Sequence, residues 1–532
     1  MPARLLDLCR ARWGERLAPA FDEAARLCRI ACGADALREI HDWLAGELGF
    51  AFATLVAEDT KDAAGRPQWL LTYLYYRDAG EPWVALALTA GARDPVVPSL
   101  SGLVNGPSLD WHEREIEDLF RIVFDGHPRL GEFILHEDWL EGAAPMRRSF
   151  DPRRRLREYL PDPDWQPPTI LTAPGAFSMP VGPVFSDFAE SAHFLLETVG
   201  EDVIHTIPRF FYKYRGVEKI AEGQPADRAL LLAERFSGTA AFAHGLAFCE
   251  AVERICGVEA PARARALRTL FAELERLRHH AATIAGICNS TALAVATSQA
   301  ALIEEDLLRL SAEVARHRYL FGVVEPGGLA IDLSPDACRR LAAAVDSAAE
   351  RLSELHRMLR YSSSFLDRLE EVGIISPATA LSYGLAGPIA RASGLARDMR
   401  KIFAYAAYGE TEFAVPVEQQ GDGYARLRVF FAEAGQSAAI IRRLAAALPD
   451  GPVATQPFAW RAGLAMAAVE APSGAAFHWL RLADDGTLSR WRVTPPAFAN
   501  WHGFHLAAEN FAFQDFPIIL ASFGLSNAEC DR

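Results

Sequence analysis

WHEREIEDLFRIVFDGHPRLGEFIL, at residues 111–135, is the stretch that decides the fold of this chain. Its apolar residues recur at helical spacing, and Trp111, Leu119 and Phe120 are predicted to lie in the core. The stretch therefore predicts a helix that packs one face against its own domain.

Four carboxylates in this helix raise the alternative of a catalytic or metal-binding site: Glu113, Glu115, Glu117 and Asp118. Paired carboxylates are common in acid–base catalysis. Glu113 and Glu117, however, share one helix face, with Arg114 and Arg121 nearby. We therefore expect a solvated, salt-bridged face or a contact with another subunit rather than catalysis.

Around this helix, residues 1–150 are predicted to form a small α/β domain, because short helical runs alternate with strand-like runs such as 69–76 and 84–88. Residues 151–169 hold five prolines and four arginines and are predicted to be a linker. A second domain is expected over residues 170–532.

The second domain is predicted to be an α-bundle with a mixed α/β periphery, which gives an α+β fold class. From Ala229 to about Val372 apolar residues recur every three or four positions, and Pro261 and Pro335 stand where helices begin. After Glu412 the pattern is mixed. Strand-like runs are predicted at 426–431, 477–482 and 490–493.

Composition excludes several classes of protein. The 532 residues are 50% hydrophobic and carry a net charge of −15, which predicts a globular protein of two or more domains and no nucleic-acid surface. The eight cysteines form no CxxC pair, so neither a disulfide framework nor a zinc site is expected, and the compartment is predicted to be reducing. No secretory signal is visible.

Residues 281–303 carry no charge and are long enough to span a bilayer. Alanine dominates them, however, and Asn, Ser, Thr and Gln interrupt them. Buried helices are therefore favoured over a transmembrane span, and any membrane contact is expected to come from partner chains.

Residues 111–135 resemble the signature of the smaller complex I subunit that adjoins the hydrogenase-like one. Residues 170–532 resemble the large subunit of nickel-iron hydrogenases, most closely the membrane-bound formate hydrogenlyase type. The matching blocks are MPVGPVFSDFAESAHF at 179–194, FYKYRGVEKIAEG at 211–223, GPIARASGLARDMRK at 387–401 and VEAPSGAAFHWL at 469–480.

The resemblance also shows what is missing. A nickel-iron site needs four thiolates from two CxxC motifs. Ser237 and Ala240 occupy the first pair of positions, and Ser526 and Glu529 occupy the second. Ser473 replaces the arginine that contacts the iron's diatomic ligands. We therefore expect no metal in this chain and no hydrogenase activity.

Cys256 stands in a run that imitates the first motif, but its register is wrong, so it is predicted to be a core residue. Phe185 and Tyr214 stand where relatives often carry histidine. The histidine at the Phe185 position binds the quinone headgroup in complex I, so this change weakens a quinone-binding role without removing it.

Two further residues have family roles by resemblance. Glu218 matches a carboxylate that passes protons from the hydrogenase site, and the alternative is a plain ion pair with a neighbouring cation. His280 matches a histidine that lies beside the iron-sulfur cluster of the small partner subunit in complex I, and the alternative is a satisfied core histidine.

The resemblance implies a peripheral subunit of a membrane-bound, complex I-like or hydrogenase-related oxidoreductase complex, which couples electron transfer to ion translocation. The alternative is the quinone-reducing subunit of an NADH or ferredoxin oxidoreductase. The expected partners are a small iron-sulfur subunit and membrane-arm subunits, and the expected place is the cytoplasmic face of the cell membrane. No cofactor is expected in this chain itself. An iron-sulfur cluster is expected in the partner, and a bound quinone is possible.

Overall fold

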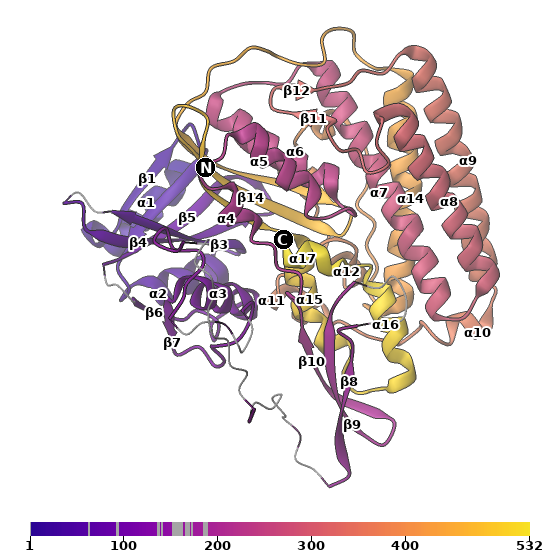
Figure 1. The fold of residues 1–532 in the computed structure, drawn as a ribbon, viewed down its shortest axis with the longest axis horizontal. Coiled ribbons are helices and arrows are strands. Elements are labelled where there is room, and N and C mark those ends of the chain that lie inside the picture. The colour runs from indigo at the N-terminus through magenta and orange to yellow at the C-terminus, as the bar shows by residue number, and fades with distance from the viewer. Residues whose placement is uncertain are drawn as a thin grey trace.

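The computed structural model describes residues 2–61, 64–91, 95–135, 139, 142–151, 163–164, 171, 174–184 and 190–532 (Figure 1). Most of the predicted linker 151–169 therefore lies outside the described residues, as does Phe185.

The N-terminal part is a five-stranded sheet with the strand order β1-β2-β5-β4-β3. Only the β2–β5 pair in this sheet is parallel. The elements of this part are α1 (Pro2–Trp13), β1 (Ala18–Asp22), β2 (Leu27–Cys32), α2 (Leu37–Asp42), β3 (Ala51–Lys61), β4 (Pro67–Arg77), β5 (Gly80–Ala90), β6 (Val96–Pro98), α3 (Pro107–Phe120) and β7 (Val123–Asp125). The strands predicted at 69–76 and 84–88 are confirmed as β4 and β5.

Helix α3 contains residues 111–120, the first part of the decisive stretch, and buries Trp111, Leu119 and Phe120 as predicted. The prediction of a solvated face for Glu113 and Glu117 is wrong for Glu113, which is 0% exposed, and Glu115, which lies outside that face, is 1% exposed. Helical spacing shows which residues share a face, but not whether polar partners lie in the interior.

Glu113 accepts hydrogen bonds from Ser99 Oγ at 2.5 Å and from the Leu100 amide at 2.8 Å. Burial raises the pKa of Glu113 to about 7. These buried donors, which lie on a loop before α3, are the physical reason why its carboxylate turns inward.

Long helices form the predicted bundle. They are α5 (Ala226–Arg235), α6 (Ala241–Cys256), α7 (Ala262–Ser290), α8 (Ala294–Ala315), α9 (Pro335–Leu359) and α14 (Gly423–Ala446). The helix starts expected after Pro261 and at Pro335 are confirmed. The uncharged stretch 281–303 is divided between α7 and α8, and no described helix has the length and apolar character that a membrane crossing requires.

The strand predicted at 426–431 is wrong, because these residues lie inside α14. Phe430 packs against His280 of α7, Phe431 stacks on His356 of α9, and Val429 packs with Ala392 of α12. Burial of these side chains outweighs their local preference for a strand.

Two small sheets and several short helices complete the second domain, and the first of these sheets is largely buried. The first sheet has β13 (Gly463–Ala471), β14 (Gly474–Leu482) and β15 (Leu488–Thr494), and the second has β8 (Ala176–Val181), β9 (His193–Val199), β10 (Asp202–Arg209) and β16 (Phe511–Ala512). The C-terminal helices are α15 (Pro496–Ala507), α16 (Phe516–Phe523) and α17 (Asn527–Asp531). Shorter elements are α4 (Val217–Ala221), α10 (Ser363–Leu366), α11 (Pro377–Ser382), α12 (Gly387–Ala392), α13 (Met399–Ile402), β11 (Val324–Glu325) and β12 (Gly328–Leu329). The strands predicted at 477–482 and 490–493 are confirmed, and so is the α+β fold class.

The N-terminal sheet packs directly on the second domain through β3, β14 and β15. Glu58 on β3 accepts two hydrogen bonds from Arg481 on β14, at 2.7 and 2.9 Å. Thr54 Oγ1 lies 2.7 Å from Thr494 Oγ1 across the same contact. This junction brings α3 close to the centre of the second domain.

Candidate functional site: a rebuilt metal centre and two buried charge networks

The four positions that lack cysteine lie at the start of α6 and around α17. Ser237, Ala240, Ser526 and Glu529 are all buried. Glu275 on α7 fixes the start of α6, because its carboxylate accepts hydrogen bonds from the amides of Phe242 and Ala243 at 2.7 and 3.0 Å.

Each of these polar side chains has a partner within the chain. Ser237 Oγ lies 2.9 Å from Thr239 Oγ1. Ser526 caps α17, since its Oγ accepts a hydrogen bond from the Glu529 amide at 3.1 Å, and the same Oγ donates to the Glu190 carboxylate at 3.0 Å.

Glu529 ends a chain of hydrogen bonds through two histidines. His244 Nε2 lies 3.0 Å from Glu529 Oε1, and His244 Nδ1 lies 3.0 Å from His478 Nε2. The indole of Trp491 donates to His478 Nδ1 at 3.3 Å. Ser473 Oγ donates to the other Glu529 oxygen at 3.4 Å.

The tryptophan fixes the direction of this chain, because an indole N–H can only donate. His478 accepts at Nδ1 and therefore donates from Nε2, so His244 accepts at Nδ1 and donates from Nε2 to Glu529. Burial, and then the neighbouring His244, hold the pKa of His478 well below its usual value, which agrees with an uncharged ring.

These residues do not fit a nickel-iron centre. Bridging of nickel and iron requires thiolate sulfur, and the four positions offer two hydroxyls, a methyl group and one carboxylate. In the part of the chain that the structure describes, no three His, Cys, Asp or Glu side chains are grouped to hold a metal ion.

Glu218, the predicted proton-transfer residue, lies at the junction of the two domains among three guanidinium groups. Its carboxylate is 3.0 Å from Arg490, 3.3 Å from Arg492 and 3.4 Å from Arg532. The Val493 amide also donates to it at 3.2 Å. Three guanidinium groups and one amide thus hold the Glu218 carboxylate, so the geometry favours the ion-pair alternative.

Glu115 of α3 joins the same cluster from the N-terminal domain. Arg492 donates to both of its oxygens, at 2.7 and 2.6 Å, and Arg532 binds it too. Burial alone would raise the pKa of Glu115, but Arg492 and Arg532 lower it to about 2. We call Glu115, Glu218, Arg490, Arg492 and Arg532 the junction network.

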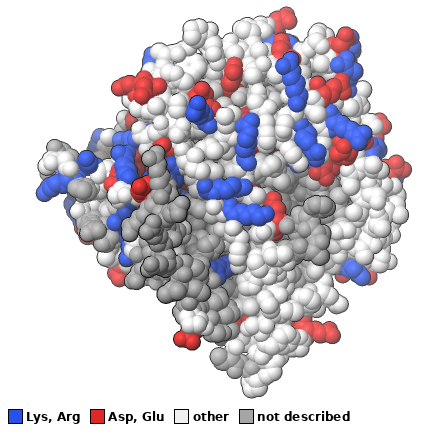
Figure 2. All heavy atoms as spheres, in the orientation of Figure 1, with Lys and Arg blue, Asp and Glu red and all other residues white. Residues whose placement is uncertain are grey.

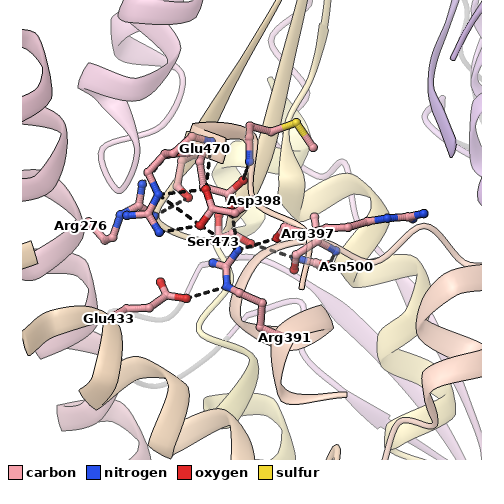
Figure 3. A network of polar contacts seen from close by, with 12 residues as sticks. Arg276, Arg391, Arg397, Asp398, Glu433, Glu470, Ser473 and Asn500 are labelled. Atoms are coloured by element: carbon pink, nitrogen blue, oxygen red, sulfur yellow. Dashed lines mark hydrogen bonds and ion pairs between the residues drawn. The ribbon is translucent and has the colours of Figure 1, made fainter. Parts of the chain in front are cut away.

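His280, the predicted neighbour of a partner's cluster, is fully buried beneath α14. Its Nε2 lies 2.9 Å from Glu433 Oε2, and the other Glu433 oxygen accepts from Arg391 Nε at 2.6 Å. Arg391 also donates to Glu470 at 2.8 Å (Figure 3). Burial lowers the pKa of His280, although Glu433 opposes that effect.

We call the lost cysteine positions together with His244, Ser473, His478 and Trp491 the rebuilt centre. The network of His280, Glu433, Arg391 and Glu470 approaches this centre at Ser473. There Asn500 donates a hydrogen bond to the Ser473 carbonyl at 3.1 Å (Figure 3). Gly387, with φ +65°, leaves room for this contact, because a Cβ there would lie 2.3 Å from the same carbonyl oxygen.

Sequence patterns identified Glu218, His280 and the four lost positions, but missed their partners. Cys256 is buried at the end of α6, as predicted, and burial raises the pKa of Tyr214. The missed residues are His478, Trp491, Arg492 and Arg532, and Glu115 was named only as a possible catalytic or metal-binding carboxylate. The clearest signal was the pair of arginines in the apolar strand LSRWRVT at 488–494, since buried arginines need carboxylate partners.

Three family models match the chain. Residues 294–461 and 454–532 match "Respiratory-chain NADH dehydrogenase, 49 Kd subunit", and residues 30–156 match "Respiratory-chain NADH dehydrogenase, 30 Kd subunit". Residues 215–283 match "Nickel-dependent hydrogenase".

Individual proteins match over most of their length. An NADH-quinone oxidoreductase subunit from Akkermansia muciniphila is 30% identical over 367 residues, which are 64% of this chain and 88% of that protein. Formate hydrogenlyase subunit 5 of Escherichia coli is 28% identical over 93% of this chain and 87% of its own length. A fused NADH-quinone oxidoreductase subunit from Bdellovibrio bacteriovorus is 27% identical over 80% of this chain and 81% of its own length.

Proposed function

Because this chain belongs to the family of the 49 Kd subunit of respiratory-chain NADH dehydrogenase, with a 30 Kd-like domain fused ahead of it, we propose that it is a peripheral subunit of a membrane-bound oxidoreductase complex. The complex is complex I-like or related to hydrogenases. In it, this chain couples electron transfer to ion translocation without a nickel-iron site.

The observation that carries this proposal is the hydrogen-bond chain from Trp491 to Glu529. It binds Glu529, at one of the four cysteine positions, while Ser237 and Ser526 have partners of their own in Thr239 and Glu190. A subunit with such a centre keeps the architecture of its family but has no thiolate with which to bind or cleave hydrogen.

The proposed partners are a small iron-sulfur subunit and membrane-arm subunits, which would hold the chain at the cytoplasmic face of the membrane. Apolar side chains exposed at and beside β8 and β9 support a partner surface, among them Phe177, Val184 and Val199, which are 53%, 89% and 38% exposed. Charged side chains gather over the helices in the upper part of Figure 2, and few are seen at its lower tip.

Within that complex, we propose that His280 tunes the iron-sulfur cluster of the partner from behind the protein surface. Its ring is buried and bound by Glu433, so its influence would be electrostatic rather than a direct contact.

Purification of the tagged chain from its native cells in mild detergent tests the proposal. We expect an iron-sulfur protein and membrane subunits to co-purify, with no stoichiometric nickel and no hydrogen evolution. Nickel at one per chain after a chelator wash, or a chain that emerges alone as a monomer, would contradict it.

The similarity to the NADH-quinone oxidoreductase subunit from Akkermansia muciniphila favours a second candidate, the quinone-reducing subunit of an NADH or ferredoxin oxidoreductase. The test is quinone reduction by the purified complex with NADH or ferredoxin as electron donor. Reduction would support this candidate, and its absence would support the first proposal.

A further inference from the structure

A cavity of about 590 Å³ lies away from the rebuilt centre, between the two fused domains. Helix α3 forms one wall, and β9, β10 and α15 form the other; these elements lie together in the lower central part of Figure 1. Cavities of this size commonly hold small organic ligands.

Arg114 of α3 lines this cavity and is only 8% exposed. Its Nη2 donates to the Glu132 carbonyl at 3.3 Å, and its Nε has no partner. No ion pair joins Arg114 to a carboxylate among the described residues. Burial lowers its pKa to about 10, so the group remains a cation at neutral pH.

A buried guanidinium group normally forms a direct ion pair with a carboxylate. The carboxylates of Asp110, Asp118 and Glu117 favour the charged form of Arg114 without such a direct pair. The two oxygens of Asp110 instead lie 3.1 Å from His127 Nε2 and 3.3 Å from His502 Nε2. Arg114 therefore keeps donor capacity for a carboxylate that enters the cavity.

Aromatic rings form the apolar part of the cavity around this cation. Arg114 lies 4.3 Å above the ring of Phe133, and Phe133 packs against Trp111 at 5.3 Å and Phe211 at 4.9 Å. Such walls favour a flat, unsaturated ligand body.

His505, on the opposite wall, brings no competing charge. Its Nδ1 donates to the His502 carbonyl at 2.6 Å, and burial lowers its pKa to about 4, so the ring is uncharged at neutral pH. Arg129 is exposed at the cavity and adds positive charge there.

We propose that this interdomain cavity binds a small aromatic carboxylate, with the carboxylate on Arg114 and the ring among Trp111, Phe133 and Phe211. The site is independent of the proposed function, because none of its residues belongs to the rebuilt centre or to the junction network.

Calorimetric titration of the full chain with three probes tests the site: 2-naphthoate, its uncharged analogue 2-naphthylmethanol, and acetate. We expect one 2-naphthoate per chain, roughly 10- to 100-fold weaker binding of the alcohol, and no detectable acetate binding. Failure of 2-naphthoate to bind at millimolar concentration, or equal binding of acid and alcohol, would overturn the proposal.

Arg114→Met should weaken 2-naphthoate binding by roughly 10- to 100-fold and leave the alcohol nearly unchanged. The matched control is Arg340→Met, which removes a surface arginine paired with Glu313. If Arg114→Met fails to fold, Ile207→Trp on β10, which fills the cavity, should abolish binding of both aromatic probes. Unchanged 2-naphthoate affinity in either variant would show that the ligand lies elsewhere.

Discussion

The rebuilt centre and the junction network are both buried and both end in the same seven residues, 526–532, yet they satisfy their polar groups differently. The centre uses single hydrogen bonds through two histidines to Glu529. The junction opposes two carboxylates with three guanidinium groups. The centre is thus closed by a chain of hydrogen bonds to one carboxylate, whereas contact between the domains rests on several opposed charges.

The largest effect is expected when one charge is removed from the junction network, which tests whether charge holds the two domains together. Arg492→Met leaves Glu115 and Glu218 buried with fewer partners, and we expect it to lower the free energy of unfolding by about 3–5 kcal/mol. Urea and thermal unfolding of the full chain measure the loss.

Arg340→Met serves again as the surface control and should change stability by less than about 0.5 kcal/mol. If Arg492→Met were as harmless as this control, the junction would not be held by charge.

The two regions should lose stability in different pH ranges as the solution is acidified. The folded chain keeps His478 neutral, whereas the unfolded chain takes up a proton below its ordinary pKa of 6.5. Stability is therefore lost as the pH falls below that value, by at most about 1.4 kcal/mol per pH unit for this ring. The pKa of Glu115, lowered to about 2 from an ordinary 4.5, gives stability that is present above pH 4.5 and lost only as the pH falls toward 2.

His478→Gln should accordingly flatten the stability curve between pH 6.5 and 5, and Glu115→Gln should flatten it below pH 4.5. Unfolding midpoints across this range measure both. The same pH dependence in both variants would show that the two regions titrate as one.

The smallest effect is expected from Glu529→Gln, which keeps the shape of the side chain and its acceptor oxygen for His244. We expect a loss of about 1 kcal/mol, close to that of one ordinary hydrogen bond. Glu115→Gln at pH 7 is the matched comparison and should cost clearly more. Equal losses would mean that the rebuilt centre is also held by charge.

The sequence predicted the architecture well where local signals agreed with packing. Pro261 and Pro335 mark helix starts because proline fits the first turn of a helix and disrupts its interior. The failure at 426–431 has a local cause as well. Asp422 caps α14 by accepting a hydrogen bond from the Ala425 amide at 2.7 Å, a helix signal that the aromatic run obscured.

The site was predictable only as a set of positions. The motifs locate Ser237 and Glu529, but the partners of Glu529 lie 285 residues away at His244 and 56 residues away at Ser473. Such pairings depend on how the domains pack, which no local spacing records. The role of Glu115 was not predicted for the same reason, since its partners Arg492 and Arg532 come from the other end of the chain.

Residues 526–532 are synthesised after every group that they bind. Ser526 meets Glu190, Ala528 meets Arg215, Asp531 meets the amides of Phe211 and Lys213, and Arg532 meets Glu115. While the chain is still on the ribosome, the N-terminal domain can form its sheet, but Glu115 lacks its ion pair with Arg532 until that residue is synthesised. Closure of both buried regions therefore follows synthesis of residues 526–532, so a nascent chain that stalls before residue 526 exposes an unfinished core to chaperones and proteases.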